Sequence, residues 1–194
     1  MTMCTFDKYK NVIAVSNRNL CDRPFMVQLE RVCQCHPKAL ILREKDLTEK
    51  EYEALAEKVL ELCGQYQVPC ILHTYAEVAT RAAHSIIHLP LPVLEKYSNK
   101  LQNFQVVGCS VHSVEDALKA QKLGATYLTA GHIYSTDCKK GLPPRGLDFL
   151  EEVCRKVTIP VYAIGGIHMG TGQLEEVMDR GAKGGCIMSE MMRI

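Results

Sequence analysis

The sequence predicts an α/β fold, a (β/α)8 barrel formed by one domain over residues 1–194. Three observations support this prediction. Short apolar, β-branched runs alternate with amphipathic segments along almost the whole chain. There are eight such runs, with seven helical segments between them. The chain has 194 residues, 47% of them hydrophobic, so a single domain can bury a substantial core.

The eight predicted strands share an apolar composition and short length. They are Val12–Ser16, Ala39–Glu44, Pro69–His73, Ser85–Leu89, Gln105–Val111, Tyr127–Ile133, Pro160–Gly165 and Gly184–Ser189. Strict alternation with right-handed crossovers leaves two architectures, an open doubly wound sheet and a closed barrel. Eight strands favour the barrel.

Two of the predicted helices have clear start signals. Thr48 is followed three residues later by Glu51, which predicts a capping box. Ser113 begins a second helix, which is expected to stop at Gly124.

The sequence stops at Ile194, directly after the eighth strand, where the barrel's last helix is expected. The sequence therefore predicts a partly exposed apolar strip between the first and seventh helices. A partner subunit or the N-terminal tail would cover this strip, so a homodimer is expected.

Composition excludes several classes of protein. The net charge of +1 gives no field that would steer a nucleic acid or an anionic membrane. No apolar run approaches the roughly 20 residues that span a bilayer, and the first residues lack a secretory signal. The ten cysteines are scattered, as expected for reduced thiols. We expect a cytoplasmic protein that binds neither nucleic acid nor membrane.

Cys33-x-Cys35-His36 is similar to half of a zinc site. No second Cys/His pair with ligand spacing accompanies it, so no structural metal is predicted.

Polar residues gather where the predicted strands end, which is where barrel enzymes place their chemistry. The residues at such ends are Arg43, Lys45, Ser110, His112, His132, Gly165, Gly166 and Ser189. The segment 131–141 adds hydroxyls and two lysines, and the paired glycines allow a backbone to approach a phosphate. This pattern indicates an enzyme that acts on a small phosphorylated molecule.

Three motifs resemble those of a known family. Leu42-Arg43-Glu44-Lys45-Asp46, Gly108-Cys109-Ser110-Val111-His112-Ser113 and Ala163-Ile164-Gly165-Gly166-Ile167 are similar to the second-, fifth- and seventh-strand motifs of the thiamine phosphate synthase/TenI superfamily of (β/α)8 barrels. The resemblance covers nearly the whole chain.

That superfamily holds two chemistries. Its synthases join hydroxymethylpyrimidine diphosphate to thiazole phosphate and need Mg²⁺ for the leaving pyrophosphate. Where synthases carry an Asn-Asp pair, this chain has His73-Thr74, and where they carry a Gln and an Asp, it has His88-Leu89-Pro90-Leu91-Pro92. These residues suit Mg²⁺ poorly. The resemblance therefore implies no metal site, and no cofactor is expected.

Gly131-His132, followed by Thr136-Asp137-Cys138-Lys139-Lys140-Gly141, is similar to the other branch, the thiazole tautomerases. This resemblance implies isomerisation of a carboxythiazole phosphate tautomer to the aromatic carboxythiazole phosphate in thiamine biosynthesis. His132 is the expected base, because an imidazole with a pKa of about 6.5 can accept and return a proton near neutral pH.

The partner implied is thus a small phosphorylated thiazole. Its phosphate is expected at the backbone N–H groups of Gly165, Gly166, Met188 and Ser189. Further contacts to the substrate are expected from Arg43, Lys45, Ser110, Thr136 and Lys139.

Plainer interpretations stay open for these residues. A histidine at a strand end can be structural, the glycine pair can serve only as a tight turn, and the run from Arg43 to Asp46 can be a mutually paired rim. Cys138 beside two lysines invites a nucleophile hypothesis, although proton transfer needs no covalent intermediate. Two other functions also stay open: a synthase with a rearranged metal site and a non-catalytic, phosphate-binding regulatory barrel.

Overall fold

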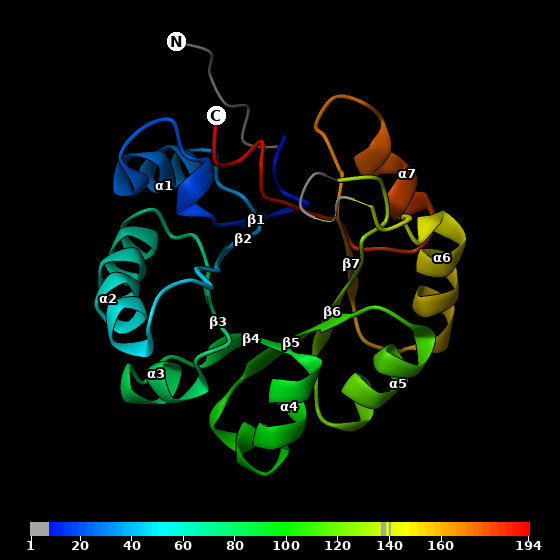
Figure 1. The fold of residues 1–194 in the computed structure, drawn as a ribbon, viewed down its shortest axis with the longest axis horizontal. Helices are drawn as coiled ribbons and strands as arrows, with labels where there is room; N and C mark the ends of the chain where they lie inside the picture. The colour runs from blue at the N-terminus through cyan, green and yellow to red at the C-terminus, as the bar shows by residue number, and fades with distance from the viewer. Residues whose placement is uncertain (1–7, 137–138, 140) are drawn as a thin grey trace.

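In the computed structural model, which describes residues 8–136, 139 and 141–194, eight parallel strands form a closed barrel (Figure 1). Each strand pairs with the next one in the chain, and β8 pairs with β1. The helices lie around the outside of this barrel. The predicted closed barrel is confirmed, and the open doubly wound sheet is excluded.

The elements follow the predicted order. The strands are β1 Val12–Val15, β2 Ala39–Leu42, β3 Cys70–His73, β4 Ile86–Pro90, β5 Val106–Val111, β6 Tyr127–Gly131, β7 Val161–Ile164 and β8 Gly185–Ile187. The helices are α1 Phe25–Gln34, α2 Glu49–Gln65, α3 Ala76–Arg81, α4 Leu91–Tyr97, α5 Val114–Lys122, α6 Gly146–Lys156 and α7 Gln173–Asp179, with short 3-10 helices η1 Arg18–Leu20 and η2 Ser98–Asn103. Within the described residues, no helix is long and apolar enough to cross a membrane.

Most strands are shorter than predicted, and β4 is shifted by one residue. The strand predicted to reach Glu44 ends at Leu42. The physical reason is local, because the backbone N–H of Arg43 donates to the Ser16 hydroxyl (2.8 Å) rather than to a neighbouring strand. Strand β2 therefore ends where the polar residues of the segment Arg43–Asp46 begin.

Both faces of the strands are buried, which explains their unbroken apolar runs. On β1, Ile13 and Val15 point into the barrel, whereas Val12 and Ala14 pack toward the helices. The barrel interior is filled by one apolar cluster made of Ile13, Val15, Ala39, Ile41, Ile71, Tyr127, Tyr162 and Cys186.

Helix α2 is fixed at its start and to the strands beside it. The Glu51 carboxylate accepts from the Thr48 N–H (2.9 Å), and the Thr48 hydroxyl caps Glu51, so the predicted capping box is confirmed. Tyr52 donates to the Leu42 carbonyl (2.7 Å) and accepts from the His73 N–H (2.8 Å). Helix α2 therefore holds the carboxyl ends of β2 and β3.

The expectation of an exposed apolar strip beside the eighth strand is wrong for the described part of the chain. No helix follows β8 there, but Met191 and Met192 are fully buried in the same cluster as Val12 and Ile187. Figure 1 shows this last segment, in red, running beside α1. The side-chain amide of Gln28 on α1 donates to the Met191 carbonyl (2.9 Å).

Among the described residues only Val27, Leu118 and Leu142 are large, apolar and exposed. The homodimer was expected because of the apolar strip, so the structure gives no support for it. The oligomeric state stays a prediction.

Candidate active site

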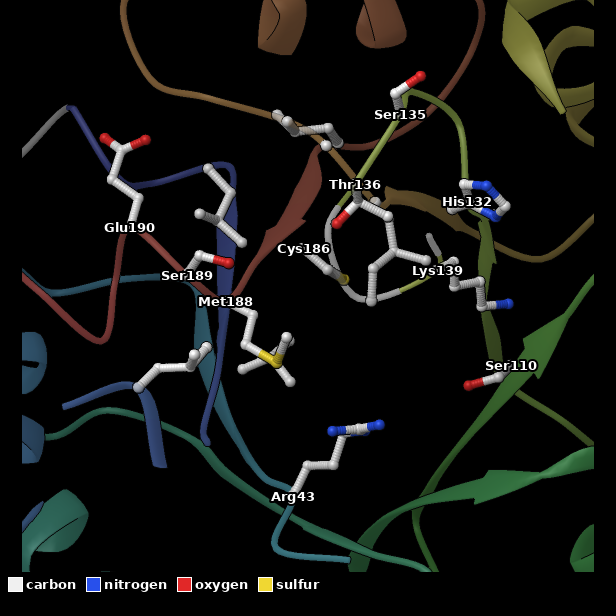
Figure 2. Close-up of a pocket in the computed structure, with 18 of the residues that line it drawn as sticks. Arg43, Ser110, His132, Ser135, Thr136, Lys139, Cys186, Met188, Ser189 and Glu190 are labelled. Carbon is white, nitrogen blue, oxygen red and sulfur yellow. The ribbon is translucent and has the colours of Figure 1, made fainter. Parts of the chain in front are cut away.

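A cavity of about 880 Å³ lies at the carboxyl ends of the strands (Figure 2). The structure brings all the predicted site residues to this one cavity. They are Arg43, Lys45, Ser110, His132, Thr136, Lys139, Gly165, Gly166, Met188 and Ser189. The sequence did not single out several other residues of the wall, among them His168 and Glu190. What each residue does there stays a prediction.

His132 follows β6 and is almost completely buried, with 6% of its surface exposed. Its backbone is fixed on two sides: the Arg145 N–H donates to the His132 carbonyl (2.9 Å), and the next residue, Ile133, donates to Ile164 (3.0 Å). The Nε2 atom lies 3.4 Å from the Leu142 carbonyl oxygen, whereas the buried Nδ1 atom has no hydrogen-bond partner among the described residues. The His132 ring lines the cavity wall, and a buried ring nitrogen without a partner is unusual for a histidine with a purely structural role.

The two glycines after β7 lie against this histidine. Gly165 and Gly166 have φ angles of +102° and +71°, which favour glycine. A Cβ at Gly165 would overlap the Cβ of His132, and one at Gly166 would overlap the Ser135 carbonyl. The turn alone therefore requires both glycines, so their presence does not by itself establish a phosphate site.

Free backbone donors do line this end of the cavity. Among the hydrogen bonds that join described residues, none is donated by the N–H groups of Gly165, Gly166, Met188 or Ser189. These groups are available to a ligand oxygen, and the phosphate site predicted there stays a prediction.

Cationic side chains also line the cavity. Figure 2 shows the Arg43 side chain reaching toward the middle of the cavity. Burial lowers the pKa of Lys45, and the nearby charges of Arg43 and Lys139 lower it further. Three positive groups that repel one another in one cavity favour an anionic ligand.

The acidic members of the same segment have other partners. Glu44 accepts from the Ser16 hydroxyl (2.7 Å) and pairs with Arg18 (3.1 Å), which also pairs with Asp46 (2.7 Å). The idea of a rim paired within itself is therefore wrong for Glu44 and Asp46, because Arg18 comes from a different loop.

Two of the other imidazoles that line the cavity, His112 and His73, differ from His132. His112 donates from Nδ1 to the Gly131 carbonyl (2.7 Å), and burial lowers its pKa. His73 lies 2.7 Å from the Thr74 hydroxyl through its Nδ1 atom, and burial, with the nearby His88 and Arg43, holds its pKa well below the usual value. Both rings already have a partner for Nδ1.

The residues of the cavity do not fit Mg²⁺, which prefers carboxylate and water oxygens. Glu190 is the carboxylate among the described residues of the wall, and it already accepts from the Met169 N–H (3.0 Å). His73 and Pro90 line the wall where the resemblance would place metal ligands. The described residues contain no group of three or more His, Cys, Asp or Glu that could hold a metal ion.

The sequence analysis missed two residues of the cavity wall, and one of its candidates lies outside the described residues. Glu190 and His168 directly follow Ser189 and Ile167, so extending each strand-end motif by one residue would have found them. Cys138, the considered nucleophile, lies outside the described residues.

Comparison with known proteins places this geometry in a family. The chain is 32% identical over 174 residues to thiamine-phosphate synthase 2 of Streptococcus pneumoniae, covering 87% of this chain and 80% of that protein. It is 35% identical over 158 residues to the putative thiamine-phosphate synthase 2 of Aquifex aeolicus, covering 79% and 83%.

A solved structure agrees with these relatives. Thiamine phosphate pyrophosphorylase from Pyrococcus furiosus superposes with a TM-score of 0.81 at 27% identity, covering 96% of this chain and 89% of that one. Residues 12–191 match the family described as thiamine monophosphate synthase. The chain therefore belongs to the thiamine monophosphate synthase family.

Proposed function

We propose that this member of the family is a metal-independent thiazole tautomerase of thiamine biosynthesis. One observation carries the proposal: the His132 ring, whose buried Nδ1 atom has no described partner, lines a cationic cavity whose described residues do not fit Mg²⁺. The substrate is a carboxythiazole phosphate tautomer with a double bond outside the ring, and the product is the aromatic isomer.

The reaction moves one proton and shifts conjugated double bonds. His132 removes the proton from the ring carbon that bears the carboxylate, and the C–H electron pair forms a double bond within the ring. The conjugated double bonds shift so that the exocyclic double bond moves into the ring, and the π electrons released at the exocyclic carbon form its new C–H bond with the proton that His132 returns. No oxidant or second substrate is needed. A base positioned in this way contributes on the order of 10²–10⁴-fold.

The remaining groups bind and orient the substrate. The N–H groups of Gly165, Gly166, Met188 and Ser189 bind its phosphate, beside the turn that touches His132. Arg43, Lys45 and Lys139 balance its negative charge. Fixing both ends of the substrate keeps the two reacting carbons within reach of one imidazole.

The names of the relatives favour a second candidate, a thiamine phosphate synthase. It would join hydroxymethylpyrimidine diphosphate to thiazole phosphate and release pyrophosphate with the help of Mg²⁺. The donor set described above argues against it, because the described wall offers a single carboxylate that is already hydrogen-bonded.

Activity assays on one preparation of the purified protein distinguish the candidate functions. The protein is incubated with the unstable thiazole tautomer, and the absorbance of the aromatic product is followed with and without a chelator. We expect turnover that the chelator does not change. Pyrophosphate release that requires Mg²⁺, measured with the pyrimidine diphosphate and thiazole phosphate, would establish the synthase instead. Binding of the product without any turnover would indicate the regulatory barrel.

A further inference from the structure

A chain of hydrogen bonds inside the barrel ends at Ser110 in the cavity wall. The Tyr127 hydroxyl lies 2.9 Å from Nδ1 of His88, and Nε2 of His88 lies 2.8 Å from the Ser110 hydroxyl. Tyr127 and His88 are buried and do not line the cavity, whereas Ser110 does. The chain thus connects the barrel interior to the site.

Strand register makes this contact possible. His88 on β4 and Tyr127 on β6 are both in register with Gly108 on the strand between them. A Cβ at Gly108 would overlap both the Tyr127 ring and Nδ1 of His88. The two side chains therefore meet over a position that only glycine can occupy, and the next residue on that face of β5 is Ser110.

The direction of these hydrogen bonds follows from the chemistry of the groups. Burial lowers the pKa of His88 to about 3, so the ring is neutral and carries one N–H and one lone pair. Burial also raises the pKa of Tyr127 well above its usual value, so the phenol keeps its proton. His88 Nδ1 is the acceptor that the described residues offer to this proton. If Tyr127 donates to Nδ1, the proton of His88 is on Nε2 and points at Ser110.

The Ser110 oxygen then receives two donors. One is Nε2–H of His88, and the other, at 3.3 Å, is the Thr129 hydroxyl. With both lone pairs used, the Ser110 proton is directed to a group outside this network. Figure 2 shows the Ser110 hydroxyl facing the cavity that Arg43 enters.

We propose that His88 and Tyr127 are positioning residues that hold Ser110 as a dedicated hydrogen-bond donor to a carboxylate oxygen of the ligand. The direction of the hydrogen bonds rests on the contacts among Tyr127, His88 and Ser110 and on the neutral state of the buried His88 ring. The identity of the ligand as a carboxythiazole phosphate rests on the proposed function.

Nitrogen NMR of protein with ¹⁵N-labelled histidines tests the direction. The His88 signals are assigned from their loss in His88→Gln. We expect the Nε2–H tautomer in the wild-type protein and a mixture of tautomers, or the Nδ1–H form, in Tyr127→Phe. Tyr162→Phe is the matched control, since Tyr162 lies in the same apolar cluster, contacts the Tyr127 ring edge-on at 5.9 Å and does not hydrogen-bond to His88. An Nδ1–H tautomer in the wild-type protein would overturn the proposal.

Calorimetry with two ligands tests the consequence. The ligands are carboxythiazole phosphate and the same thiazole phosphate without the carboxylate. Ser110→Ala and Tyr127→Phe should each weaken the affinity for carboxythiazole phosphate by about tenfold, as expected for the loss of one hydrogen bond to a charged group. Their affinity for the thiazole phosphate without the carboxylate should not change. Tyr162→Phe should change the affinity for neither ligand. Equal losses for both ligands, or none, would contradict the assignment of the carboxylate to Ser110. If the wild-type protein binds neither ligand, the proposed function fails, and the NMR result still decides the direction of the hydrogen bonds.

Discussion

His132 is the imidazole of the cavity whose buried Nδ1 atom has no described partner. His112 uses Nδ1 to bind the Gly131 carbonyl, and His73 uses it beside Thr74. A ring already engaged in this way is held in place by its partner, whereas the Nδ1 atom of His132 provides no such anchor. For this reason we propose His132, rather than His73 or His112, as the base.

Arg43 gives a prediction at the same scale. Arg43→Gln removes the cation that reaches toward the middle of the cavity, so we expect KM to rise about 10–100-fold, the effect of losing a hydrogen bond to a charged group. Steady-state kinetics on the thiazole tautomer measures this. Arg155→Gln, at an exposed position on α6 outside the cavity, is the control for the change in net charge. A KM equal in both variants would remove Arg43 from the binding site.

The strand-end rule predicted which residues meet in the cavity, because every carboxyl end of a barrel opens on the same side. The rule could not predict how they are held. The contact of Tyr127 with His88 depends on the register of three strands and on the space above Gly108. Periodicity along one strand carries no information about either.

The capping box at Thr48 is a local sequence motif that we expect to stabilise helix α2. The capping box at Thr48 satisfies the first N–H groups of a helix that holds the ends of β2 and β3 through Tyr52. Thr48→Ala should lower the free energy of unfolding by about 1 kcal/mol, measured by urea denaturation. Glu57→Ala, on the exposed face of the same helix, should have little effect. If Thr48→Ala and Glu57→Ala lowered the free energy of unfolding equally, the capping box would not stabilise helix α2.

The residues after β8 show where prediction from an element pattern fails. The five residues after the predicted eighth strand, from 190 to 194, have no helical or strand periodicity, so their packing was not predicted. The buried Met191 and Met192 nevertheless take the place of a covering helix. The interaction of Gln28 with the Met191 carbonyl joins two segments far apart in the sequence, which no local signal reports.

At the scale of the whole molecule, two buried histidines link stability to pH. Burial lowers the pKa of His88 to about 3 and that of His73 well below its usual value. Unfolded histidines have a pKa of about 6.5. Between these values the unfolded chain binds more protons than the folded one, so stability falls as the pH drops below about 6.5 and continues to fall toward about 3.

Urea denaturation at several pH values between 7 and 5 measures this linkage. His88→Gln removes one of the two groups, so the decline of unfolding free energy with falling pH should be shallower by up to one proton, about 1.4 kcal/mol per pH unit. Gln102→Ala, which removes no titratable group at an exposed position, should keep the wild-type slope. Identical slopes in the wild-type protein and His88→Gln would mean that His88 can be protonated in the folded state.

The closed barrel was predictable from the sequence, because eight strands that alternate with helices strongly favour this fold. The oligomeric state was not, since its only basis was an apolar strip that the described residues do not expose.

The central claim is that one imidazole, without a metal ion, moves the proton. The most direct test is the rate of aromatic product formation by wild-type protein and by His132→Asn, both with chelator and at saturating tautomer. The account predicts a folded variant, with the wild-type unfolding temperature, whose rate is lower by about 10²–10⁴-fold. An undiminished rate in that folded variant would contradict it.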